Sequence, residues 1–361
     1  MRTCLVVVLL TAPLCQTSAL ADEPLRALVD RYWSELLCRH PLEATLFVGD
    51  RCNEDRVNDP SVAGYEEWLA SLRQIDHELG LIASPWLPGQ NIRRRSPNEQ
   101  IDLEVLSGMI RDRLDLARHG DHLIPLSQLL RSPTDVHAED LHLVFAQLGE
   151  FHPAHTAGDV ENYLRRLDAF PKLADGLIDV MRRGMAEKKT PPQVSMRRVV
   201  PQLRSMAGDK AEDNPLWAFV DRLPEDRREA AADRVRASIR HRVAPAYQKL
   251  ADFVEREYLP ACRDTIGLVD TPEGASHYAL LVRHYTTTDL TAEEVHAMGL
   301  ENVAKTREAM EAVREKVGFQ GDLKAFLAHV RDDPALRNTT SEAIVEGHRK
   351  ILSEMNLALP K

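Results

Sequence analysis

The side chains best suited to chemistry gather near the C-terminal end of the chain. His284 is followed by three consecutive threonines, Thr286, Thr287 and Thr288, and then by His296. Because β-branched residues favour extended backbone, the threonines would offer hydroxyl and backbone polar groups to an extended polar substrate such as a peptide. We take these five residues as candidate substrate-binding residues. In the alternative interpretation, His296 is a buried core histidine and the threonines form a turn.

A helix must carry the last of these residues. Thr291 and Glu294 have the spacing of a capping box, which predicts a helix over residues 292–317 with Gly318 as its stop. A glycine inside a helix costs about 1 kcal/mol relative to alanine. Gly299 therefore predicts a close backbone approach at that point of the helix.

The chain lacks the sequence motifs of several common catalytic sites. HExxH, the GxSxG nucleophile elbow, the phosphate-binding GxxxxGK loop and GxGxxG are all absent. One stretch is rich in side chains that could bind a divalent cation, namely Asp135, His137, Glu139, Asp140, His142, His152 and His155. A divergent hydrolase using this cluster is one hypothesis, but we assign no catalytic and no metal-binding residue.

Composition limits the class of protein. The chain has 361 residues, of which 43% are hydrophobic and 28% charged, and its formal net charge is −10. The apolar content excludes disorder. The negative charge argues against nucleic acid as a partner, since phosphate binding needs a basic surface. No stretch approaches 18 apolar residues, so we expect no transmembrane segment.

The first 21 residues read as a secretory signal peptide. A positive start at Arg2 and an apolar run over residues 4–15 precede the small-x-small pattern at residues 19–21. We expect cleavage after Ala21, which makes the protein exported, either periplasmic or extracellular.

Three cysteines would remain after that cleavage: Cys38, Cys52 and Cys262. In an oxidising compartment they permit one disulfide. Cys38 and Cys52 are close enough in sequence to pair, but their spacing does not require it, and we expect free, mostly buried thiols. The absence of a CxxC pair excludes a structural zinc ribbon.

The hydrophobic periodicity is helical along the mature chain. It predicts an all-α array of long antiparallel helices with at most a small β element, weakly indicated at residues 198–200 and 267–269. The expected helices cover residues 25–37, 62–75, 97–118, 139–149, 159–169, 171–188, 193–206, 224–258 (kinked near Pro245) and 292–317. Pro171 is expected to restart the chain, and Thr190-Pro191-Pro192 to break it.

The order of several segments resembles the bacterial family called domain of unknown function 885. The matching pieces are Arg31–Trp33, Pro41–Thr45, Glu161–Leu167 with Phe170-Pro171, Arg183–Ala186 with Thr190–Pro192, Tyr258–Ala261 and His284–Gly299. The resemblance implies a mainly helical protein related to zinc metallopeptidases. Family members carry their zinc site further on, in a helix bearing HExxxGHH and at a later glutamate.

The resemblance covers about the first three-fifths of the family pattern, and the HExxxGHH segment is absent here. No metal ligand or general base is therefore carried over, and zinc is implied only for full-length members. We expect an exported, truncated or split member without hydrolase activity alone, whose partners are a peptide substrate or a separate catalytic half. The alternative is a non-catalytic peptide- or protein-binding module that uses the retained cleft. If a missing region packs on these helices, its absence exposes apolar stripes.

Overall fold

The computed structural model describes residues 23–84, 96–129, 140–337 and 340–359. Within these ranges every regular element is helical, and the β contact is an isolated parallel bridge between Pro192 and Arg263. The expected all-α class with at most a small β element is confirmed. The signal peptide expected at residues 1–21 lies outside the described residues and stays a prediction. None of the described helices has the length and hydropathy needed to cross a membrane.

The chain forms two compact units, residues 1–284 and 285–361. The helices that begin in the first unit are α1 (Glu23–Arg39), α2 (Pro41–Glu43), α3 (Val62–Ala83), α4 (Pro97–Arg118), α5 (Leu141–Ala146), α6 (Leu148–Phe151), α7 (Ala157–Ala186), α8 (Gln193–Met196), α9 (Val199–Met206), α10 (Ala218–Arg222), α11 (Glu225–Ser238), α12 (Ala244–Phe253), α13 (Leu259–Ala261) and α14 (Gly274–Thr286). Three π-helical turns, Ala44–Val48, Ile239–Val243 and Val254–Tyr258, continue α2, α11 and α12, and short 3-10 turns cover Asp121–Leu123, Ala211–Asp213, Pro215–Trp217 and Leu268–Asp270.

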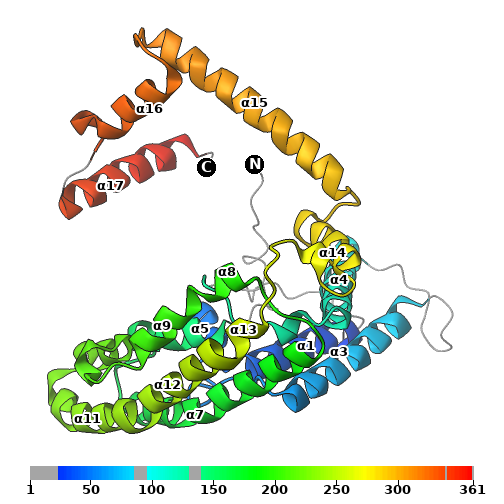
Figure 1. The fold of residues 1–361 in the computed structure, drawn as a ribbon, viewed down its shortest axis with the longest axis vertical. Helices are drawn as coiled ribbons and strands as arrows, with labels where there is room; N and C mark the ends of the chain where they lie inside the picture. The colour runs from blue at the N-terminus through cyan, green and yellow to red at the C-terminus, as the bar shows by residue number, and fades with distance from the viewer. Residues whose placement is uncertain (1–22, 85–95, 130–139, 338–339, 360–361) are drawn as a thin grey trace. The chain divides into compact units, whose positions relative to one another are not determined.

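Helix α7 is the central element of the first unit. It packs against α11, α12 and the π-helical turn between them (Figure 1). Of its 30 residues, 15 are buried. The ring of Phe170 lies 4.3 Å from that of Phe145 and 4.3 Å from that of Tyr247. A second cluster, which includes Leu72 and Ile110, joins α1, α3 and α4.

Pro171 does not restart the chain, contrary to the prediction, because α7 runs through it without a break. A proline inside a helix costs about 3 kcal/mol through its missing N–H and its ring clash. Its neighbours Phe170 and Leu173 are fully buried. Each buried side chain of this size contributes about 1.5–3 kcal/mol, so the packing of α7 outweighs the local penalty.

Locally encoded boundaries agree with the prediction. Ser96 forms a complete capping box at the start of α4, and α7 ends before Thr190. The long helix expected over residues 224–258 is present as α11, α12 and the π-helical turns that follow each of them, and the first of these turns ends two residues before Pro245. Proline has no amide N–H to donate to the carbonyl four residues earlier, and the change to π-helical hydrogen bonding lies at this point of the helix.

The helix expected over residues 193–206 is present as α8 and α9, of which α9 packs along α12, so the weakly indicated β element at residues 198–200 does not form. Residues 268–269 lie in a 3-10 turn. Burial of one side of a helix here overrides the β-branched preference. Cys38 and Cys52 are exposed rather than buried, whereas Cys262 is buried, and all three are free thiols.

The second unit contains α15 (Ala292–Lys316), α16 (Leu323–Asp332), a 3-10 turn (Pro334–Leu336) and α17 (Ser341–Ala358). Its helix starts agree with the capping box at Thr291, and Gly318 takes a left-handed φ of 70° after α15 ends. Among its described side chains only Phe326 is buried, where it contacts Phe319 at a ring distance of 5.4 Å. This unit therefore has almost no core of its own.

Gly184 of α7 tests the close packing of the first unit. A Cβ at this position would lie 2.6 Å from the Leu123 carbonyl oxygen and 2.8 Å from that of Lys189. Both are backbone atoms, which cannot rotate away. We expect Gly184→Ala to lower the free energy of unfolding by about 2 kcal/mol, measured by urea denaturation.

The matched control is Gly108 of α4, where a Cβ would meet no heavy atom within 4 Å. Because alanine is the better helix former, Gly108→Ala should raise the free energy of unfolding by about 0.5–1 kcal/mol. Effects of the same sign for the two variants would contradict the described packing.

Candidate functional site

Of the three threonines of the predicted site, Thr286 is the last residue of α14, and Thr287 and Thr288 form a bend directly after it. The hydroxyl oxygens of Thr286 and Thr288 lie 2.8 Å apart, and the Thr287 hydroxyl donates to the Thr286 carbonyl oxygen at 2.7 Å. Thr287 has a φ of 54°, which is a rare conformation for a β-branched residue. The run is thus a bend held by its own side chains rather than extended backbone. Its substrate-binding role stays a prediction.

His296 lies exposed in α15, so the alternative that it is a buried core histidine is wrong. Gly299 on the same helix meets no heavy atom within 4 Å of the position where a Cβ would be, and the close backbone approach expected there is also wrong. Both misses have one cause. The sequence pattern predicts that a face of α15 is packed, but α15 buries no side chain among the described residues.

His284 is in the first unit, near the end of α14, where its Nδ1 lies 3.2 Å from Asp112 Oδ2 of α4. One residue earlier, Arg283 forms an ion pair with Asp115 at 3.2 Å. The boundary between the two units therefore separates His284 from the four other predicted site residues. In its own unit, His284 helps to attach α14 to α4.

A stacked pair of imidazoles forms the other part of this attachment. The rings of His119 and His277 lie 4.9 Å apart and nearly parallel, and His277 Nε2 is 3.3 Å from Asp121. Burial lowers the pKa of His119, and the nearby His277 lowers it further, while Glu273 acts in the opposite direction. Because His277 is 4% exposed, this pair positions α14 rather than presenting an open general base.

The cluster proposed as an alternative hydrolase site does not assemble in the part that the structure describes. His152 lies in the core, and the hydroxyl of Tyr247 donates to the carbonyl oxygen of the buried His142 at 2.8 Å. No group of three metal-ligating side chains gathers among the described residues. Asp135, His137 and Glu139 lie outside them.

A hollow of about 420 Å³ opens beside α5, α9 and α12. Its lining is mainly apolar and includes His142, Gln202, Ser205 and Tyr247. The Tyr247 hydroxyl already bonds the backbone, and the described lining has no carboxylate to orient an imidazole. The hollow does not offer the groups of an acid–base site.

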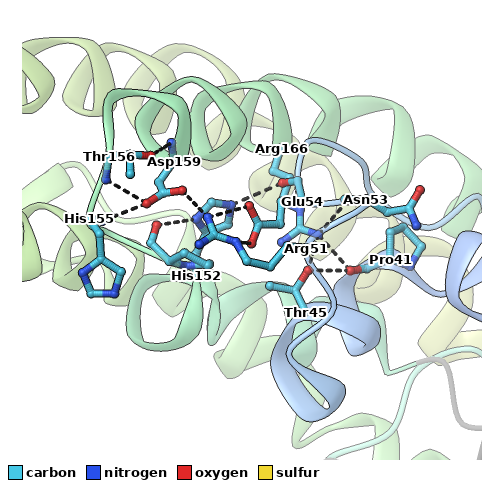
Figure 2. A network of polar contacts seen from close by, with 11 residues as sticks. Pro41, Thr45, Arg51, Asn53, Glu54, His152, His155, Thr156, Asp159 and Arg166 are labelled. Atoms are coloured by element: carbon cyan, nitrogen blue, oxygen red, sulfur yellow. Dashed lines mark hydrogen bonds and ion pairs between the residues drawn. The ribbon is translucent and has the colours of Figure 1, made fainter. Parts of the chain in front are cut away.

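The most extensive buried polar contacts surround Arg166 of α7 (Figure 2). Its side chain is 0% exposed. Its Nε donates to the Arg56 carbonyl oxygen at 2.8 Å, and its Nη2 contacts the Pro41 carbonyl oxygen and Thr45 Oγ1, both at 2.8 Å. Burial lowers the pKa of Arg166 to about 10, so it stays charged near neutral pH. These bonds fix the segment after α2 against α7.

A second arginine, Arg51, connects the same segment to the first turn of α7 (Figure 2). Arg51 donates from Nε to Glu54 at 2.8 Å and pairs with Asp159 in the first turn of α7. Burial acts to raise the pKa of Asp159, but the N–H groups of His155 and Thr156 and the charge of Arg51 together lower it. The ion pair of Arg51 with Asp159 therefore binds the segment to the start of α7 through a charge-assisted bond.

His152 contacts the same segment through the backbone of Glu54. Its Nδ1 lies 3.0 Å from the Pro153 carbonyl oxygen and its Nε2 lies 3.2 Å from that of Glu54. Burial, assisted by the charge of Arg166, lowers the pKa of His152 to about 4. The imidazole is thus neutral and structural.

This network joins two of the segments that carried the family resemblance, Pro41–Thr45 and Glu161–Leu167. The sequence alone does not reveal a role for Arg166, because its partners lie more than 100 positions away. The only signal available was an arginine placed among apolar residues on the buried face of a helix. Its contacts are with backbone and side chains of the protein itself, so we assign it a structural role.

Replacing Arg166 tests that role. Arg166→Met removes the donor and leaves several buried carbonyl groups without a partner, so we expect a loss of about 3 kcal/mol in the free energy of unfolding. The matched control is the neighbouring Arg165, which is exposed and 3.6 Å from Asp55. Arg165→Met should change stability by about 0.5 kcal/mol or less, and equal losses would contradict the assignment.

His152 also predicts a pH dependence. Its folded pKa of about 4 lies below the 6.5 that is usual for histidine, so the unfolded chain binds more protons between these values. Its contribution to stability is present above pH 6.5 and is lost as the pH falls toward 4, by about 3 kcal/mol in total. Compared with wild type, His152→Asn should flatten the plot of unfolding free energy against pH in this window. A slope equal to that of the wild type between pH 4 and 6.5 would contradict the assigned pKa shift of His152.

Comparison with known proteins shows the family. The model of a family described as "Bacterial protein of unknown function (DUF885)" matches residues 41–361. No curated protein matches the chain. Among solved structures, one titled "The crystal structure of the putative lipoprotein from Colwellia psychrerythraea" is 18% identical with a TM-score of 0.74. The match covers 92% of this chain and 57% of the Colwellia chain.

The Colwellia structure shares the fold, and this chain spans little more than half of its length. The family match extends over both units and includes the Arg166 network and the threonine bend. The chain belongs to the DUF885 family of bacterial proteins.

Proposed function

We propose that this chain is the non-catalytic helical part of an exported, zinc-metallopeptidase-like protein and has no hydrolase activity by itself. In this proposal a catalytic region packs on the second unit, as separate or further polypeptide. In the same proposal the first unit has a structural role.

The observation behind this proposal is the exposure of apolar side chains throughout the second unit. Val303 and Met310 of α15 are 67% and 40% exposed, and Val317, directly after the helix, is 61% exposed; the three lie seven residues apart. On α17, Val345 and Leu352 show the same spacing, with 47% and 58% exposed. A seven-residue spacing places side chains on one helix face. These faces are suited to packing against further apolar helices, because most of the stability of a helix in a protein comes from the packing of its apolar face.

The length of the Colwellia chain supports the same view. The part of that chain outside the match is 43% of it, from the 57% that is covered. Zinc hydrolysis needs three protein ligands and an open position for water. The described residues of this chain do not fit such a site, so the proposal places the ligands in the catalytic region.

One feature favours the alternative, a peptide-binding module without catalysis. The left-handed backbone of Thr287 is costly for a β-branched residue, and it lies in the bend between α14 and α15. Such conformations concentrate at binding sites. In this alternative the chain would be complete in its function, and the second unit would need no covering region.

The state of association distinguishes the two proposals. If the apolar faces of α15 and α17 need a partner, the purified chain from Asp22 onward should self-associate in light scattering. The double substitution Val303→Glu and Leu352→Glu should shift it toward monomer, because charge on both faces opposes their burial. Incubation with a peptide library, with or without added Zn²⁺, should give no cleavage.

Val194 of α8 is the control for the charge substitutions. It is 53% exposed but lies in the first unit, so Val194→Glu should leave association unchanged. A monomeric wild-type chain would favour the peptide-binding module. Peptide cleavage that chelation abolishes would refute both proposals.

A further inference from the structure

Two of the three free thiols lie in segments that the fold brings together. Cys38 is in the last turn of α1, and Cys52 is fourteen positions later, in the turn that follows Gly49. The side-chain amide of Asn53 donates to Cys38 Sγ at 3.8 Å. The residue next to Cys52 in the chain therefore lies directly against Cys38.

The turn around Cys52 is fixed on both sides of the cysteine. Arg51 pairs with Glu54 and with Asp159 of α7, and the Asn53 carbonyl oxygen accepts from Arg166 Nη2 at 3.0 Å. The turn is thus held against α7, and Asn53 within it contacts the end of α1. This fixed position raises the effective concentration of one thiol at the other.

Both thiols are exposed, whereas Cys262 is buried. A small oxidant can therefore reach Cys38 and Cys52 but not Cys262. The charge and hydrogen bond of Asp50 raise the pKa of Cys52, and a smaller contribution to the same shift comes from Cys38. The higher pKa leaves less of Cys52 as thiolate, so the case for an oxidisable pair rests on the exposure of both thiols and on the contact between Asn53 and Cys38.

We propose that Cys38 and Cys52 form an intramolecular disulfide in the exported protein and that Cys262 stays a thiol. The oxidant is a small-molecule disulfide. The Cys38 thiolate attacks it and one small thiol leaves; the Cys52 thiolate then attacks the Cys38 sulfur of the mixed disulfide and the second small thiol leaves. Two protons and two electrons pass from the protein thiols to the small disulfide.

The bond would lock the segment that surrounds the buried guanidinium. The loop it closes contains Pro41 and Thr45, whose oxygen atoms contact Arg166. Closing a loop of this length restricts the unfolded chain and stabilises the folded one. The inference does not depend on the proposed metallopeptidase relation, because the thiols, their exposure and their surroundings belong to the first unit alone.

The experiment treats the purified chain from Asp22 onward with oxidised glutathione, blocks remaining thiols under denaturing conditions and maps peptides by mass spectrometry. We expect a peptide linked through Cys38 and Cys52, with Cys262 alkylated. The oxidised chain should unfold roughly 5 °C higher than the reduced one. Cys38→Ser and Cys52→Ser should each abolish both the link and the difference.

Three outcomes would overturn the proposal. Cys38 and Cys52 could both be alkylated after oxidation, each could carry glutathione, or Cys52 could link two chains. The peptide map of the wild-type chain decides among them even if a serine variant folds poorly. Cys262→Ala serves as the control and should keep the Cys38–Cys52 link.

Discussion

A buried positive charge imposes the strictest constraint on the first unit. Removing a guanidinium from water is costly unless its N–H groups find acceptors. The Nε and Nη2 groups of Arg166 find them in the carbonyl oxygens of Pro41, Asn53 and Arg56 and the hydroxyl of Thr45, whereas its buried Nη1 has no hydrogen-bond partner among the described residues. All of these acceptors belong to one short segment. The segment must therefore adopt a single course, which explains its π-helical turn and the left-handed Gly49 that follows. The charge is solvated by backbone rather than neutralised by a directly bonded carboxylate.

The two units differ in how much apolar surface they bury: the first buries a large core, and the second buries almost none among its described side chains. The first has a continuous core around α7, including stacked rings such as Tyr163 on Phe219 at 3.9 Å. The second has capped, regular helices but one buried side chain among those described. Helix caps and propensities can define where α15 begins and ends, but they cannot supply the free energy that packing provides. This contrast is the physical basis of the proposal that a further region covers the second unit.

The predicted site illustrates how the same residues change meaning with their surroundings. His284 lies close to the threonines in sequence, yet its Nδ1 contacts Asp112 of α4 in the first unit. The threonines bond to one another and to their own backbone. Adjacency along the chain indicated a shared role, whereas the contacts divide these side chains between attaching a helix and shaping a bend.

The helical class, the capped starts of α4 and α15 and the chain break near Thr190 can be predicted from the sequence, because they depend on bonds and periodicities within a few residues. The family resemblance can be read from the order of segments along the chain. Three features become visible only in the folded chain: α7 continues through Pro171, His296 is exposed, and Arg166 is the centre of a polar network. Each of these depends on atoms far away in the chain. Packing offsets a local penalty at Pro171, the lack of packing exposes His296, and acceptors more than 100 residues away stabilise the charge of Arg166.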